Sequence, residues 1–211
     1  MATVAATASS ATTVVAPSSS YARFAGLCAI LAGVVGFLYS VAFVVLKNNL
    51  LSALFLLIVG LLTTAVVVAL YERLKTIDGS FALWALLLGL TGAMGSVVHG
   101  GYDLANALHP PSQGFADIPN VADPRGLLTF GIAGASLWIV AWLMTRSAHF
   151  PKNLAYVAYA AAILLIVLYL ARLIVLDATS LAVVVPALLA GFLVNPVFYV
   201  WLGLTLWRTD Q

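Results

Sequence analysis

Long, uninterrupted apolar runs constrain this chain more than any other feature of its sequence. A helix that crosses the hydrocarbon core of a bilayer needs about 20 apolar residues. Six runs reach that length, and they cover residues 22–46, 50–71, 81–105, 126–145, 154–176 and 182–206. Each run ends at a charge, a proline or a turn. The sequence therefore predicts an all-α fold, a polytopic membrane bundle of six transmembrane helices.

The composition excludes several classes of protein. Hydrophobic residues make up 64% of the 211 positions and charged residues only 8%, whereas a soluble domain carries about 25% charged residues. Such a chain has too few charged residues to form a surface exposed to water. The lipid bilayer is therefore its expected main partner. A net charge of +2 is too small to indicate a nucleic-acid partner. A single cysteine, Cys28, allows no intrachain disulfide.

The sequence predicts a tail followed by one membrane domain. Residues 1–20 are rich in Ala, Ser and Thr and carry no charge, so they lack the basic residues of a secretory signal or a transit peptide. We expect a flexible tail over 1–20 and a six-helix transmembrane domain over 21–208.

Basic residues predict the orientation, because they favour the cytoplasmic side of a membrane. With the N-terminus inside, the cytoplasmic set is Arg23, Arg73, Lys75, Arg146, Lys152 and Arg208. The set at or towards the outside is Lys47, Arg125 and Arg172. The larger inside set favours an N-in/C-in arrangement.

A polar stripe interrupts the third apolar run. Five small or polar residues fall within roughly 80° of one another on a helix that turns about 100° per residue. They are Gly92, Ser96, His99, Asp103 and Asn106. Hydrocarbon cannot form hydrogen bonds with such side chains, so another helix or water must cover them.

Two polar residues in other runs can join this stripe. Arg172 lies in the predicted outer third of the fifth run, and Asn195 precedes Pro196 near the middle of the sixth. We expect Asp103 and Arg172 either to form an ion pair or to face one cavity. The candidate polar pocket is thus Ser96, His99, Asp103, Asn106, Arg172 and Asn195. Two alternatives stay open: a structural network that only fixes helix register, and a plain packing kink at Pro196.

Small residues recur at every fourth position in two runs. The first run carries Ala25, Ala29 and Gly33, and the third carries Gly92, Ser96 and Gly100. Such stripes let helix backbones approach closely. Packing within the bundle is the favoured interpretation, and a dimer interface is the alternative.

The longest predicted loop covers residues 107–125 and contains Pro110, Pro111, Pro119 and Pro124. The prolines stiffen its path. Phe115 and Ile118 could turn it back onto the bundle as a lid. A stiff external loop and a segment that docks a partner are the alternatives.

Residue counting argues against several cofactors and leaves the cofactor unknown. Retinal needs a lysine inside a helix, whereas Lys47, Lys75 and Lys152 all lie at predicted helix ends. Covalent haem needs a Cys-x-x-Cys-His motif, and the sequence has none. No metal-binding motif is present either, and His99 is the only histidine expected inside the membrane.

One catalytic motif is incomplete. Gly134-Ala135-Ser136 in the fourth run resembles the serine motif of rhomboid proteases. That family needs a histidine on the sixth helix, and this chain has none there. Ser136 therefore lacks the base that a serine nucleophile requires.

The segment Arg23-Phe24-Ala25-Gly26-Leu27, the six-helix layout and the aromatic last run resemble an uncharacterised family of small bacterial six-helix membrane proteins. The resemblance implies the architecture, and it implies a multi-pass protein of the bacterial inner (plasma) membrane. It implies no function and no site residues.

Three classes of function remain. We expect most a non-catalytic subunit or assembly partner of a membrane complex, because catalytic motifs are absent and small-residue faces are plentiful. Its partners would be other membrane subunits or further copies of the chain. The first alternative is a small-solute or proton-coupled transporter or channel that uses the polar pocket. The second is an intramembrane enzyme that acts on a lipid-like substrate.

Overall fold

The fold is a bundle of membrane-length helices. A computed structural model describes residues 19–110, 125–177 and 179–208, and all its regular elements are helices. In chain order they are α1 (Ser19–Ser40), η1 (Val41–Val45), α2 (Asn49–Leu74), α3 (Gly79–Leu108), η2 (Leu127–Ile132), α4 (Ala133–Arg146), α5 (Lys152–Val175), α6 (Leu181–Leu188), η3 (Leu189–Val194) and α7 (Asn195–Arg208), where η marks a π-helical segment.

Six of the resulting continuous helices are long and apolar enough to cross a membrane. Three of these spans are compound: α1 continues into η1, η2 into α4, and α6 through η3 into α7. The predicted all-α bundle of six spans is therefore confirmed. The fold fits a multi-pass membrane protein.

Capping side chains decide where two of the helices begin. The Asn48 side chain accepts a hydrogen bond of 3.0 Å from the Leu51 N–H, so α2 starts at Asn49. Asp78 accepts bonds of 3.1 Å from the N–H groups of Ser80 and Phe81, so α3 starts at Gly79. The polar residues that bound these apolar runs thus satisfy the first N–H groups of the helices.

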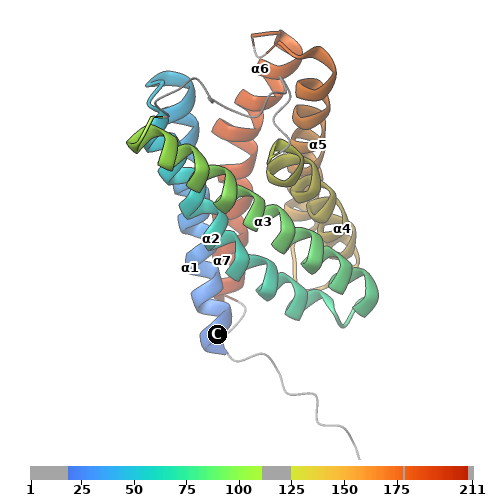
Figure 1. Cartoon of the computed structure of the whole chain (residues 1–211). Coiled ribbons are helices and arrows are strands. Elements are labelled where there is room, and N and C mark those ends of the chain that lie inside the picture. Colours follow the sequence, from blue (N-terminus) through green and yellow to red (C-terminus); the bar gives the residue numbers. More distant parts are fainter. Residues whose placement is uncertain (1–18, 111–124, 178, 209–211) are drawn as a thin grey trace, which may run out of the picture.

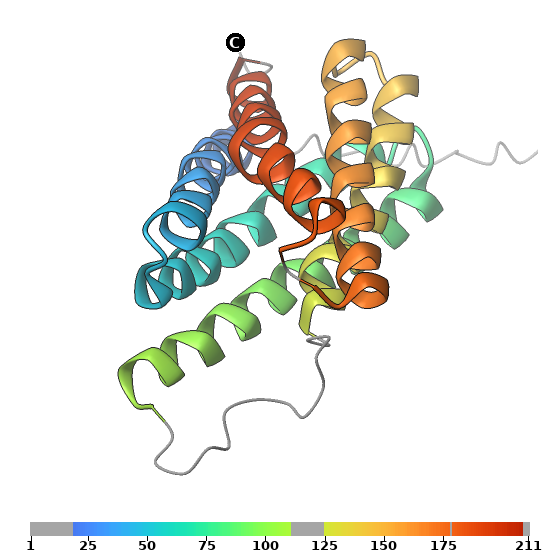
Figure 2. The same cartoon turned by 90° about the horizontal axis from the view of Figure 1, so that it is seen from above.

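The six spans form a ring. Each span contacts the next one along the chain, and α7 closes the ring by packing against α1. Figures 1 and 2 show this arrangement from two directions. Because the number of spans is even, the start of α1 and the end of α7 lie at the same end of the bundle.

Glycines allow the closest helix crossings. A Cβ atom on Gly203 of α7 would lie 2.5 Å from the carbonyl oxygen of Gly26 on α1. A Cβ atom on Gly100 of α3 would lie 2.5 Å from the backbone nitrogen of Leu57 on α2. Gly33 likewise faces Pro196 of α7. The small-residue stripes of the first and third spans are therefore used between helices of one chain, as the favoured interpretation expects.

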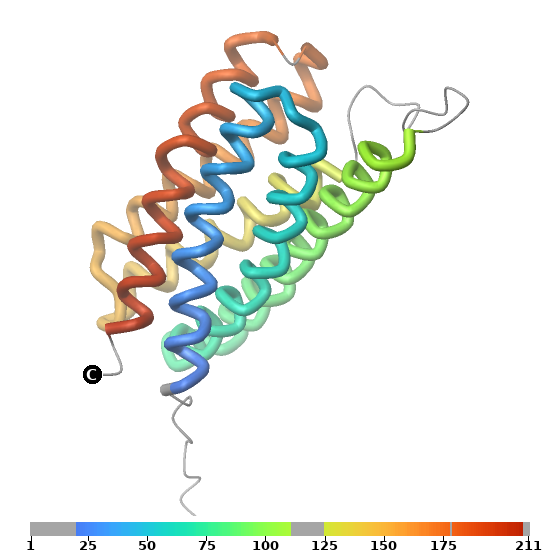
Figure 3. The backbone as a smooth tube through the Cα atoms, turned by 90° about the vertical axis from the view of Figure 1, so that its left-hand side faces the viewer, coloured from blue at the N-terminus to red at the C-terminus, as the bar shows by residue number. Residues whose placement is uncertain are grey.

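The bundle is tightly packed at one end only. This packed half, where α1 begins and α7 ends, holds a core of large apolar side chains that are almost wholly buried: Leu74, Leu143, Met144, Leu154, Leu202 and Leu206. Towards the opposite end α3 diverges from α7 (Figure 3). We call that end, where Lys47, Leu108, Arg125 and Leu176 lie, the hollow half.

All three π-helical segments lie in the hollow half. The segment η3 directly precedes Asn195 and Pro196. Because Pro196 has no N–H, it cannot bond the carbonyl of Phe192, and the regular helical ladder is interrupted there. A packing kink at Pro196 stays a prediction, and the π-helical segments η1 and η2, which contain no proline, were not predicted.

Two predicted features fall outside the described residues. The flexible tail over 1–20 lies almost entirely among residues 1–18, and the proposed lid residues Phe115 and Ile118 lie within 111–124. Both predictions stay untested.

Two neighbouring glycines of α3 test the close crossing with α2. Gly100→Ala should lower the free energy of unfolding by about 1–3 kcal/mol, because backbone atoms of Leu57 and Ala53 occupy the space of the new methyl group. Gly101→Ala is the matched control, since its Cβ would meet only the end of the Leu57 side chain at 3.8 Å. Unfolding in detergent micelles, followed by circular dichroism, measures both. Equal stability of the two variants would contradict the assigned contact.

Candidate functional site

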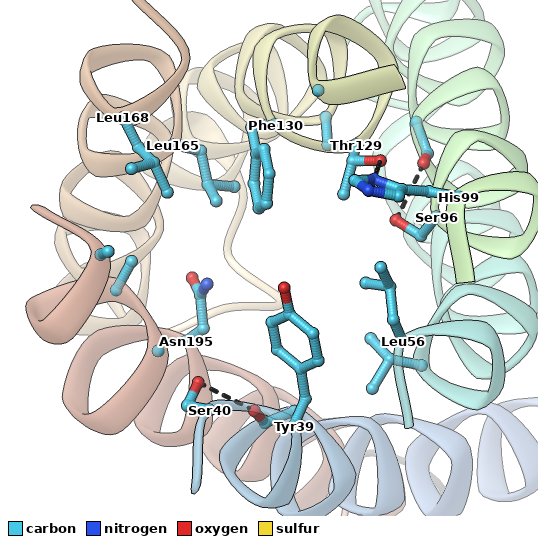
Figure 4. A pocket seen from close by; sticks show the side chains of 18 of the residues that line it. Tyr39, Ser40, Leu56, Ser96, His99, Thr129, Phe130, Leu165, Leu168 and Asn195 are labelled. Carbon is cyan, nitrogen blue, oxygen red and sulfur yellow. Dashed lines mark hydrogen bonds between the residues drawn. The ribbon is translucent and has the colours of Figure 1, made fainter. Parts of the chain in front are cut away.

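A cavity of about 1050 Å³ occupies the centre of the hollow half. All six spans contribute to its wall. Its mouth is lined by charged residues near the helix ends, among them Lys47, Asp103 and Arg172. Its floor is lined by Val140 and Phe198, where the cavity meets the apolar core of the packed half. Figure 4 shows the interior of this space.

The structure brings the whole candidate pocket together around this cavity. Four of the residues come from α3, one from α5 and one from the start of α7; they are Ser96, His99, Asp103, Asn106, Arg172 and Asn195. The glycine of the predicted stripe, Gly92, lines the cavity as well. The helical spacing that defined the stripe therefore describes one wall of the cavity.

A chain of polar contacts joins α3 to the start of the fourth span. Asp103 Oδ1 lies 3.0 Å from Arg125 Nη1, and Asp103 Oδ2 lies 3.4 Å from His99 Nε2. The other ring nitrogen of His99, Nδ1, lies 3.3 Å from the Thr129 hydroxyl. A neutral ring with its proton on Nε2 can donate to Asp103 and accept from Thr129. The network thus places an ionisable imidazole between a carboxylate and a hydroxyl.

The expected ion pair between Asp103 and Arg172 is not formed, because Asp103 pairs with Arg125 instead. Arg125 is close because α3 and the fourth span are antiparallel neighbours, so the residues that flank their connection meet at one end. In the sequence, Arg125 served only as one of the basic residues that predict the orientation. The alternative expectation, that the two residues face one cavity, is confirmed, because Asp103 and Arg172 line the same cavity.

Two polar groups project into the deeper part of the cavity. Figure 4 shows the Tyr39 hydroxyl and the Asn195 amide pointing into it. The Asn195 Oδ1 atom is buried, and no described group donates a hydrogen bond to it. An unsatisfied buried acceptor costs about 1–3 kcal/mol, so this amide is suited to a donor from a bound molecule. Tyr39 was not among the pocket residues predicted from the sequence.

Ser136 has a structural role in the described part of the chain. Its hydroxyl donates a 2.7 Å hydrogen bond to the backbone carbonyl of Ala85, and the residue is buried. The bond links α4 to α3 at the floor of the cavity. The hydroxyl is thus engaged as a donor between helices.

The charges at the mouth are predominantly positive. Lys47, Arg125 and Arg172 line it together with one carboxylate, Asp103. The Arg125 guanidinium also stacks on the Tyr102 ring at 4.5 Å. No group of three potential metal ligands occurs among residues 19–110, 125–177 and 179–208. Anion binding is therefore the chemistry that the described mouth favours.

Asp177 lies beside the mouth, outside the helical spans. Hydrogen bonds from the Thr179 hydroxyl and N–H, with a smaller contribution from the charge of Arg172, hold the pKa of the Asp177 carboxyl below its usual range. No ion pair joins Asp177 to Arg172 within the described residues, because the carboxylate is turned to Thr179. Asp177 therefore stays ionised without neutralising the arginine directly.

Comparisons with protein-family models, with curated protein sequences and with solved structures find no match to this chain.

Two threonines test the network at His99. Thr129→Val removes the hydroxyl next to His99 Nδ1 and should lower the free energy of unfolding by about 0.5–1.5 kcal/mol. Thr91→Val is the control, because the exposed Thr91 hydroxyl bonds only the carbonyl of Leu87 on its own helix. Chemical unfolding in detergent compares the variants. A Thr129 variant as stable as the Thr91 variant would show that this contact does not hold α3 to η2.

Proposed function

We propose that this protein binds a small solute in its central cavity and transports it across the membrane. The main observation that supports this proposal is the size of the cavity. Protein interiors are normally filled with few voids larger than a water molecule, whereas ligand pockets measure about 300–1,000 Å³. A space of about 1050 Å³, with polar groups aimed into it, is the size of a solute site.

The construction of the cavity wall supports movement as well as binding. Transporter sites near the middle of a membrane are typically formed by interrupted helices, and π-helical turns are frequent at functional sites. Here the segments η1, η2 and η3 all contribute residues to the wall. Interrupted helices offer points at which the hollow half could close and the packed half could open.

The orientation of the mouth rests on the distribution of basic residues. By the positive-inside rule the packed half faces the cytoplasm, and the mouth faces the opposite side. In a bacterial inner membrane the solute would then be collected from outside the cell. The network of His99, Asp103 and Arg125 lies at the mouth of the cavity. Protonation of His99 there would be coupled to the movement of the solute.

Native mass spectrometry of the gently solubilised chain tests binding. The unsubstituted chain should carry a small-molecule or lipid adduct. Leu165→Trp should lose the adduct because the indole fills the cavity into which Leu165 projects. Leu170→Trp, on the same helix but exposed on the outer surface, should keep it.

The same spectra separate this proposal from the other classes of function. A larger assembly would overturn the solute site if no adduct is lost in the Leu165→Trp variant. That result would favour a non-catalytic subunit of a membrane complex. A modified product in place of the adduct would favour an intramembrane enzyme.

Cysteine accessibility tests the path and its orientation. In a chain that carries Cys28→Ala, Asn195→Cys should react with a membrane-impermeant maleimide added outside intact cells. Leu170→Cys should not react, because it faces the surrounding lipid. Reaction of Asn195→Cys from the cytoplasmic side alone would reverse the orientation, and no reaction from either side would contradict an open cavity.

A further inference from the structure

We propose that the solute is an anionic amphiphile, with its anionic head group at Lys47 and Arg172 and its apolar chain inside the cavity. This inference rests on the proposed function, because it names the class of solute bound in that cavity. It follows from the charges of the mouth, the chemistry of the wall and the depth at which each lies.

Two cations line the mouth of the cavity. Arg172 is partly buried and lines the cavity from α5, and Lys47 lines it from the turn between η1 and α2. No described carboxylate forms an ion pair with either of them: Asp103 is taken by Arg125 and His99, and Asp177 by Thr179. A guanidinium in a membrane span is costly without a counter-charge. The mouth therefore favours an anion and disfavours a cationic solute.

The inner wall of the cavity is mostly apolar. Leu56, Phe130, Leu165 and Leu168 project into the cavity (Figure 4). Phe198 also lines it. The hydroxyl groups of Ser40, Thr63, Ser96 and Ser136 also line the cavity, but each already donates to a backbone carbonyl. Tyr39 and Asn195 point their polar groups into the open space. A sugar, a peptide or a nucleotide would leave most of its polar groups unsatisfied here, and each such group costs binding energy. An apolar chain with at most one or two polar groups fits this wall.

The two cations and the apolar wall lie at different levels of the bundle. Arg172 lies within one turn of the end of α5, and Lys47 lies beyond the end of η1, so both lie at the level where membrane head groups would be found. The apolar wall extends from that level towards the middle of the bundle. An amphiphile in a bilayer has the same arrangement, with its charge at the interface and its chain in hydrocarbon. Such a molecule could enter the cavity without reversing its orientation.

Both carboxylate and phosphate head groups suit the two cations. An arginine binds either group through two parallel N–H donors, and a lysine adds a point charge. The shared chemistry is a negatively charged head group on an apolar chain. The identity of the head group is left to the experiment.

The experiment uses the full chain in phosphatidylcholine nanodiscs, with empty nanodiscs as the background. Four probes of equal chain length are titrated: dodecyl phosphate, dodecanoate, dodecanol and dodecyltrimethylammonium. At least one anionic probe should bind about tenfold more tightly than the neutral and cationic probes, since hydrogen bonds to charged groups are the stronger ones. The better of the two anions identifies the head group.

Charge variants locate the head group. Arg172→Gln and Lys47→Gln should each weaken binding of the favoured anion about tenfold. Lys152→Gln, which removes an exposed charge at the packed end, should leave it unchanged. If Arg172→Gln does not fold, Lys47→Gln and the comparison of head groups on the unsubstituted chain still decide the question.

Two outcomes separate the failure of this inference from the failure of the proposed function. If dodecanol or the cationic probe binds as tightly as the anions, and Leu165→Trp abolishes that binding, the cavity is a solute site but the anionic class is wrong. If no probe binds in a way that depends on Leu165→Trp, and the native chain carries no adduct, the proposed function fails as well.

Discussion

The cost of placing polar groups in hydrocarbon governs this structure. A bilayer offers no hydrogen bonds, so each backbone group and each polar side chain must find its partner within the protein or in water that the protein admits. Within each helix the backbone N–H and C=O groups pair with one another. Many polar side chains of the six spans line the central cavity. His99 and Asn195 can lie within apolar spans because they face the cavity that the ring surrounds.

The two halves of the bundle meet this requirement in different ways. In the packed half, small residues such as Gly26 and Gly203 bring helix backbones together, and large apolar side chains fill the remaining space. In the hollow half, the helices diverge, three π-helical segments interrupt the regular ladder, and polar groups face a cavity. The cavity removes packing contacts that a filled core would make. The large buried apolar cluster therefore lies mainly in the packed half, whereas Leu168, Ala171 and Val183 form only a small described cluster elsewhere.

The residues that line the site could be predicted from the sequence better than the contacts among them. The stripe from Gly92 to Asn106 could be predicted because helical periodicity puts its members on one face. The partner of Asp103 could not, because several basic residues were available at the same depth. Arg125 is the partner through the antiparallel contact of neighbouring spans. Tyr39 could not be assigned to the pocket either, because a tyrosine near a helix end is equally typical of the membrane interface.

The sequence by itself determined that this chain forms six membrane-length helices, approximately where each one begins and ends, and which face of the third helix is polar. These features follow from local composition and from the period of the helix. The tertiary structure alone decided that the ring closes through α1 and α7, that one half is hollow, and that Lys47 and Arg172 line one mouth without a described carboxylate partner. Such facts depend on how helices distant in sequence cross and diverge, and local periodicity carries no information about those crossings.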